Sequence, residues 1–257
     1  MAMSASRLVR EKLRTGRVAV WVGMAALIAL GWLYMVRMNA SMATMHPMAM
    51  PAATGLSALL ATLGMWVVMM VAMMLPSIFP TVSLFAVLAG RRSPAAATRM
   101  TAMFVTGYAL VWIAYCVPAA TAQWGLSRAE LLSAMGESTS AAISAAILVA
   151  AGLFQFSPMK NACMTKCRSP LAFLLNEWRD GAVGALVVGM RNGWNCVGCC
   201  WAVMAVLFVV GTMNLLWMAL FTFLVLTEKI APARWRLDWI VGTGFIAWGA
   251  VTAGGVL

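Results

Sequence analysis

The chain has 257 residues, of which 63% are hydrophobic and only 10% charged, and its mean hydropathy of +0.91 excludes a water-soluble globular domain. The net charge of +11 does not indicate nucleic-acid binding, because Lys and Arg stand between apolar stretches instead of gathering on one polar face. The composition predicts an all-α, polytopic membrane helical bundle of about seven transmembrane helices, with membrane lipid around it and no nucleic-acid partner.

Seven apolar segments are the expected spans. They are residues 18–38, 57–88, 101–122, 140–157, 196–212, 214–227 and 239–256. With a cytoplasmic N-terminus, all basic residues except Arg37 and Arg128 fall on the inside, as expected of a multi-pass protein of the cell inner (cytoplasmic) membrane. Residues 18–257 then form a single transmembrane domain. Residues 1–17 are a cytoplasmic basic tail, either a helix on an anionic leaflet or a solvated segment.

The loop after the first span concentrates soft metal ligands. They are Met42, Met45, His46, Met48 and Met50, and two prolines keep the loop extended. Thioether sulfur holds Cu(I) but is a poor ligand for Zn(II), and imidazole also suits copper. The loop therefore indicates low-affinity copper collection, while a flexible linker in a methionine-rich protein would show the same composition.

The second span repeats methionine at helical spacing. Met65, Met69 and Met73 are four residues apart and form one stripe. Pro76 and Pro80 remove backbone donors from the same span, so we expect a kinked helix. The stripe has two interpretations, a relay of thioethers for the metal or packing by a flexible apolar side chain.

Five of the six cysteines fall into two clusters. Cys163 and Cys167 follow the fourth span at four-residue spacing, which places both thiols on one side of a helical turn. The second cluster comprises Cys196, Cys199 and Cys200. Because thiolates are soft ligands, the two clusters together are the predicted Cu(I) site, with zinc the less suitable cofactor. Cys116 stands alone and is expected to pack as a small hydrophobe.

The depth of the second cluster depends on the placement of residues 182–190. This stretch is too short to cross a membrane. Three residues that follow it are costly at bilayer depth, namely Arg191, Asn192 and Asn195. We therefore expect a short re-entrant or interfacial segment here, with Cys196 at the inner end of the fifth span. An alternative register runs one helix over 182–203 and the next over 204–227, which moves the cluster toward the outer half.

Five longer motifs carry a resemblance to known proteins. They are MMLPS at 73–77, GLFQFSPMK at 152–160, CMTKCRSP at 163–170, GWNCVGCCW at 193–201 and GTMNLLWM at 211–218. Through them the chain resembles, over about residues 66–229, the predicted metal-binding integral membrane proteins catalogued as a domain of unknown function. The resemblance implies metal handling, of copper above all, and supplies no established reaction. Asn192 stands where many relatives carry histidine, so no imidazole is expected beside Cys196.

These observations favour a copper-handling membrane protein that binds Cu(I) through Cys and Met and either imports it or delivers it to a cuproenzyme or a copper chaperone partner. One alternative is a membrane thiol-disulfide oxidoreductase, in which Cys196 and Cys199 exchange electrons with the other cluster. Another is an assembly subunit with a structural zinc site of four thiolates. No pattern indicates catalytic residues, so a binding protein is favoured over an enzyme.

Overall fold

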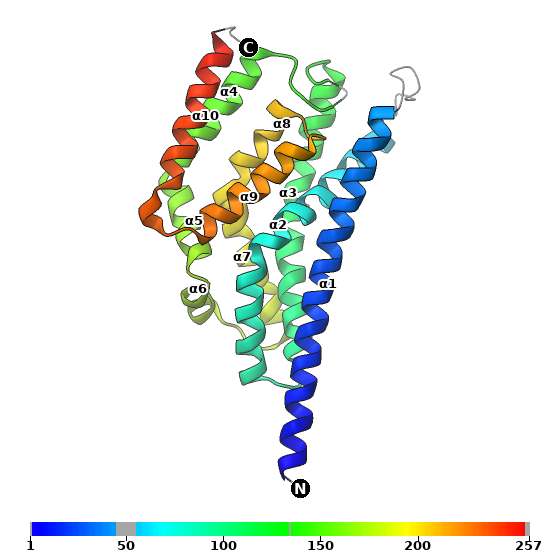
Figure 1. The fold of residues 1–257 in the computed structure, drawn as a ribbon, viewed down its shortest axis with the longest axis vertical. Helices are drawn as coiled ribbons and strands as arrows, with labels where there is room; N and C mark the ends of the chain where they lie inside the picture. Colours follow the sequence, from blue (N-terminus) through cyan, green and yellow to red (C-terminus); the bar gives the residue numbers. More distant parts are fainter. Residues whose placement is uncertain (1, 45–54, 134, 255–257) are drawn as a thin grey trace.

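A computed structural model of the chain describes residues 2–44, 55–133 and 135–254, with side chains described outside residues 2–17, 42–44 and 233. The described part is all-α, as predicted. Its helices are α1 Ala2–Thr44, α2 Leu56–Arg92, α3 Ala97–Arg128, α4 Ala141–Gln155, α5 Pro158–Arg168, α6 Pro170–Glu177, α7 Gly181–Ala205, α8 Leu207–Val210, α9 Leu215–Ile230 and α10 Leu237–Ala253, with a 3-10 turn at Ala233–Trp235. Figure 1 shows an elongated bundle in which α1 begins at one end and α10 finishes at the opposite end.

Several of these helices are long and apolar enough to cross a membrane. The four that qualify singly are Val18–Ser41, Leu56–Arg92, Ala97–Arg128 and Gly181–Val210. α4 and α5 qualify as a pair, although they are bent by 61° at the break between them. α9 and α10 are shorter, with 16 and 17 residues. The described part thus has four or five candidate spans, which is the pattern of a multi-pass membrane protein.

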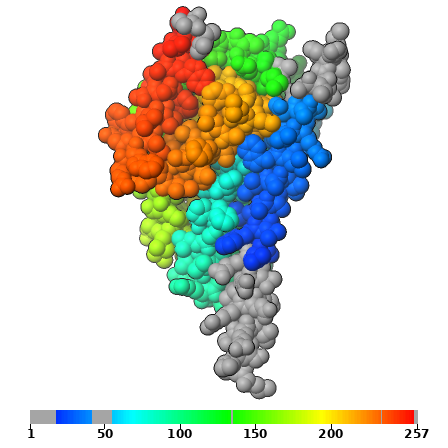
Figure 2. All heavy atoms as spheres, in the orientation of Figure 1, coloured from blue at the N-terminus to red at the C-terminus, as the bar shows by residue number. Residues whose placement is uncertain are grey.

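The first two helices follow the sequence pattern. α1 runs without a break from Ala2, so the basic N-terminal residues extend the first span as helix. α2 contains Pro76 and Pro80, and Figure 1 shows it changing direction near its middle, so the predicted kink is present. Together with α9 and α10, these helices form much of the face drawn in Figure 2.

The stretch before the second cysteine cluster is not re-entrant. α7 is continuous through it, and α8 carries the span on to Val210. Its polar residues are tolerated because they meet protein: Asn192 and Asn195 are buried in the bundle, and Arg191 pairs with Glu177 of α6. The re-entrant or interfacial segment expected at residues 182–190 is therefore wrong, and the alternative register describes α7 better.

The chain reverses between α8 and α9 at residues 211–214. Gly211 has a φ of 92°, which residues with a side chain rarely adopt. Asn214 caps α9, its side chain accepting hydrogen bonds from two backbone N–H groups. The expected fifth span, 196–212, thus ends in the right place but begins too late, whereas the expected sixth span, 214–227, corresponds to α9.

Glycines hold α3 and α7 together in the most extensive helix contact of the described bundle. α7 carries Gly189 and Gly193 one turn apart. A Cβ atom at Gly189 would overlap the carbonyl oxygen of Phe104 on α3, and one at Gly107 would overlap the carbonyl oxygen of Leu186 on α7. Small residues let helix backbones approach closely in membranes. This contact fixes α7, and with it the second cysteine cluster, against α3.

Candidate metal site

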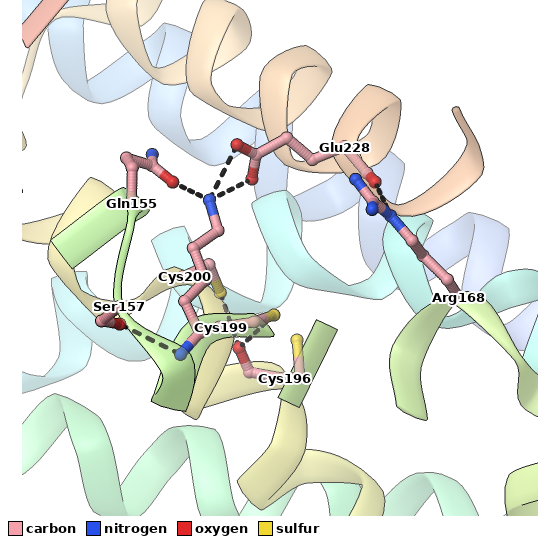
Figure 3. Close-up of polar contacts among 8 residues, drawn as sticks. Gln155, Ser157, Arg168, Cys196, Cys199, Cys200 and Glu228 are labelled. Carbon is pink, nitrogen blue, oxygen red and sulfur yellow. Dashed lines mark hydrogen bonds and ion pairs between the residues drawn. The ribbon is translucent and has the colours of Figure 1, made fainter. Parts of the chain in front are cut away.

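The thiols of α7 lie in the middle of the bundle. Cys196, Cys199 and Cys200 are each at most 1% exposed, and Cys196 stands midway along the Gly181–Val210 span. The expected position at the inner end of a span is therefore wrong. Within the helix, the thiols of Cys199 and Cys200 donate hydrogen bonds to the carbonyl oxygen of Cys196, at 3.1 and 2.8 Å (Figure 3).

α5 brings the other two thiols to α7. It begins directly after the bend from α4, because Pro158 favours the first helical turn and the Ser157 side chain accepts a hydrogen bond from the backbone N–H of Lys160 at 3.1 Å. Cys163 lies against Gly198 of α7, where a Cβ atom would stand only 2.7 Å from the cysteine sulfur. The two clusters, which are about thirty residues apart in sequence, therefore meet at the α5–α7 contact.

A small cavity of about 10 Å³ is lined by one cysteine from each cluster. Its lining residues are Ser77, Ile78, Thr81, Tyr108, Cys167, Asn192, Cys196 and Lys229. The volume is about that of one water-sized particle, so a single ion fits. Cys167 of α5 and Cys196 of α7 are the two soft donors at this cavity.

Side chains of α9 and α3 contact the sulfur of Cys196, and α2 in turn contacts both of these side chains. Lys229 of α9 places Nζ 2.9 Å from this sulfur and donates to Ser77 Oγ of α2 at 2.8 Å. The hydroxyl of Tyr108, on α3, lies 3.2 Å from the same sulfur and donates to the carbonyl oxygen of Met74 at 3.2 Å. The α2 contacts lie just before and after Pro76, so the kink helps to shape the cavity.

A buried ion pair fastens α5 beside the cysteines. Lys160, which is 1% exposed, donates to both carboxylate oxygens of Glu228 on α9 at 2.8 and 2.9 Å, and to the amide oxygen of Gln155. Arg168, further along α5, donates through Nε to the backbone carbonyl of Glu228 at 2.7 Å. Figure 3 draws Gln155, Glu228 and Arg168 together with the α7 cysteines. These contacts hold the helix that carries Cys163 and Cys167 against the end of α9.

Several residues around the site were not predicted from the sequence. The charge pattern places Lys160, Glu228 and Lys229 at the cytoplasmic ends of spans, whereas the structure buries Lys160 and Glu228 in the bundle and places the half-buried Lys229 at the cysteine cavity. Tyr108 has no distinguishing pattern at all. One signal was available: Glu228 is one of only seven acidic residues in the chain and directly follows an apolar run, where an acidic side chain requires a partner.

The methionine stripe is buried and does not line the cavity. Met65, Met69 and Met73 are each at most 3% exposed, and none of them lines the cavity between Cys167 and Cys196. Their burial fits packing, so a relay remains a prediction. The loop ligands lie outside the residues whose side chains are described; they are Met42, Met45, His46, Met48 and Met50.

The donor set suits Cu(I) better than Zn(II). Within the described residues, no three Cys, His, Asp or Glu side chains are grouped closely enough to hold a metal ion. A structural zinc site takes four ligands. Cu(I) prefers soft sulfur, and Cys167 and Cys196 are the sulfur-bearing side chains among the described residues that line the cavity.

Comparison with known proteins agrees with this chemistry. The sequence profile of a family described as PpoB2, a copper chaperone, matches residues 63–252. No curated protein and no solved structure matches the chain. The matched region covers most of the sequence and includes both cysteine clusters and the helices around them. The chain therefore belongs to the PpoB2 copper chaperone family.

Proposed function

We propose that this membrane protein holds Cu(I) between the thiols of α5 and α7 and delivers it to a copper-requiring enzyme or to a second chaperone. The observation that carries the proposal is the cavity shared by Cys167 and Cys196, which are soft donors from two separate parts of the sequence. Membership of a copper chaperone family supports copper as the cargo. Import of copper through the bundle would use the same site.

The other thiols provide a route for transfer. Cys163 lies against Gly198 of α7. In the sequence, Gly198 stands between the cavity cysteine Cys196 and the next two thiols, Cys199 and Cys200. Cu(I) passes between soft ligands when a new sulfur binds before an old one leaves, so neighbouring thiols lower the cost of each exchange. In this proposal Cys167 and Cys196 hold the ion at rest, and the other three accept it on the way to a partner.

Seven membrane crossings complete the proposal. They follow if α4 and α5 form one span and α9 and α10 also cross, although a helix of 16 residues is only about 24 Å long. An odd number agrees with the opposite ends at which α1 begins and α10 finishes in Figure 1. With residues 1–17 in the cytoplasm of a cell inner membrane, the methionine- and histidine-rich loop lies outside, and Met65, Met69 and Met73 precede the cysteines on the path inward.

The alternative functions have less support. A thiol-disulfide oxidoreductase must let the sulfur of its partner reach its own thiol. The α7 cysteines are at most 1% exposed, so a partner's sulfur could reach only the half-buried Cys163 and Cys167 of α5 directly. A structural zinc site of four thiolates would need a tighter grouping than the described residues provide.

Removing both cavity thiols tests the proposal. We expect wild-type protein in detergent, loaded without oxygen, to bind one equivalent of Cu(I) against a chromophoric Cu(I) chelator, and Cys167→Ser/Cys196→Ser to lose this binding because a hydroxyl is a hard ligand. Cys116→Ser is the control, since Cys116 is as buried as Cys196 but does not line the cavity. Undiminished binding by the double variant would contradict the proposal.

A further inference from the structure

Lys229 brings a positively charged group to the cysteine cavity. Its Nζ lies 2.8 Å from Ser77 Oγ and 2.9 Å from Cys196 Sγ. Among the described residues, neither of the two ion pairs involves this lysine. An ammonium group that is partly withdrawn from water is stabilised by an opposite charge nearby. The sulfur of Cys196 is the group placed to supply it.

The second lysine of this region is balanced already. Lys160 faces Glu228 at 2.8 Å, and the two charges cancel as a unit. Neither of these residues lines the cavity, and Arg168 does not line it either. Among the described residues that line the cavity, Lys229 is thus the one basic or acidic side chain besides the cysteines and Tyr108.

The formal charges then distinguish one metal ion from another. Two thiolates and one ammonium group leave one net negative charge, which a monovalent ion cancels and a divalent ion exceeds. An uncompensated charge inside a bundle is costly, because the interaction between charges is strong where water is excluded. We infer that Lys229 is a specificity-determining residue that favours Cu(I) over divalent ions such as Zn(II) at the thiol site. The inference rests on the proposed function, because it takes Cys167 and Cys196 as the ligands.

The geometry supports this assignment over a purely structural role. A lysine whose only role was to link α9 to α2 would need no partner other than Ser77, to which Lys229 donates a hydrogen bond. Lys229 instead also points its ammonium group at a sulfur that faces the cavity. Any ion bound at Cys196 would therefore lie close to this charge, and a divalent ion would be repelled twice as strongly as a monovalent one.

The test measures two affinities for each protein. Wild-type and Lys229→Met proteins in detergent are titrated without oxygen with Cu(I) against a chromophoric chelator, and with Zn(II) against a fluorescent zinc indicator. The cost of deprotonating the thiols is common to both ions and cancels in the ratio of affinities. We expect the Cu(I)-to-Zn(II) ratio to fall by about tenfold or more, because one unit of charge at contact distance is worth at least that much in a protein interior.

Two further variants separate charge from other effects. Lys229→Arg keeps the charge and should restore most of the wild-type ratio. Lys166→Met removes an exposed lysine that neighbours Cys167 in sequence but does not line the cavity, and it should leave the ratio unchanged. If Lys229→Met fails to fold, Lys229→Gln removes the same charge and keeps a polar end.

The outcomes distinguish this inference from the proposed function. An unchanged ratio in Lys229→Met, with Cu(I) still bound, would overturn the role of Lys229 and leave the copper site standing. A fall of the same size in Lys166→Met would also overturn it, because the effect would then be one of overall charge. Failure of the wild-type protein to bind Cu(I) would overturn both.

Discussion

We expect Lys160→Met to lower the free energy of unfolding by about 3–5 kcal/mol, because it leaves the carboxylate of Glu228 buried without a partner. Both side chains of the pair are at most 2% exposed, so water cannot replace the lost ammonium group. The methionine fills a similar volume, so the loss reflects charge rather than a cavity. Reversible unfolding in mixed micelles, followed by the fluorescence of the twelve tryptophans, measures this change.

The exposed ion pair of the same region provides the control. Arg191 and Glu177 have side chains that are 45% and 27% exposed, so Arg191→Met should cost about 1 kcal/mol or less. Replacing both members of the buried pair, as Lys160→Met/Glu228→Leu, should cost less than Lys160→Met alone, since no buried charge then remains. Equal small losses in Lys160→Met and Arg191→Met would show that the buried pair is not formed.

We expect Gly189→Ala to destabilise the protein by about 2 kcal/mol or more, through overpacking at the α3–α7 contact. The added methyl group would overlap the carbonyl oxygen and the carbonyl carbon of Phe104. Backbone atoms cannot move aside as a flexible side chain can, so the two helices must separate. The same unfolding measurement reports the loss, and Cu(I) affinity should fall with it because α7 carries Cys196.

Whether a Gly→Ala substitution lowers or raises the stability distinguishes a close helix contact from an open helix face. In an open helix, alanine is more favourable than glycine by up to about 1 kcal/mol. Gly64 of α2 has nothing within 4 Å of the position of an added Cβ atom, so Gly64→Ala should leave stability unchanged or raise it. A gain in stability for Gly189→Ala as well would contradict the close approach of α3 and α7.

Much of the fold could be predicted from local patterns. Apolar runs identify α2, α3, α4 and α10, and the prolines at 76 and 80 identify the kink, because each of these signals depends only on neighbouring residues. The placement of residues 182–190 failed for the opposite reason. Whether Asn192 can lie inside a membrane helix depends on the helices around it, and those contacts are made by residues far away in sequence.

The residues of the candidate site also fall into those that the sequence predicts and those that only the packing of the helices reveals. The cysteines are conspicuous by type and spacing, so both clusters could be found from the sequence. Lys229 and Tyr108 could not, since a lysine after an apolar run also fits the end of a span and a tyrosine fits any part of one. Their roles become visible only when α3 and α9 are packed beside Cys196.

X-ray absorption spectroscopy at the copper edge tests the central claim, that thiols from α5 and α7 share one ion. Wild-type protein loaded with one equivalent of Cu(I) should show two sulfur neighbours and no nitrogen or oxygen in the first shell. In Cys167→Ser one of the sulfurs should be lost. A first shell of nitrogen and oxygen in the wild type, or identical sulfur shells in the two proteins, would contradict the account.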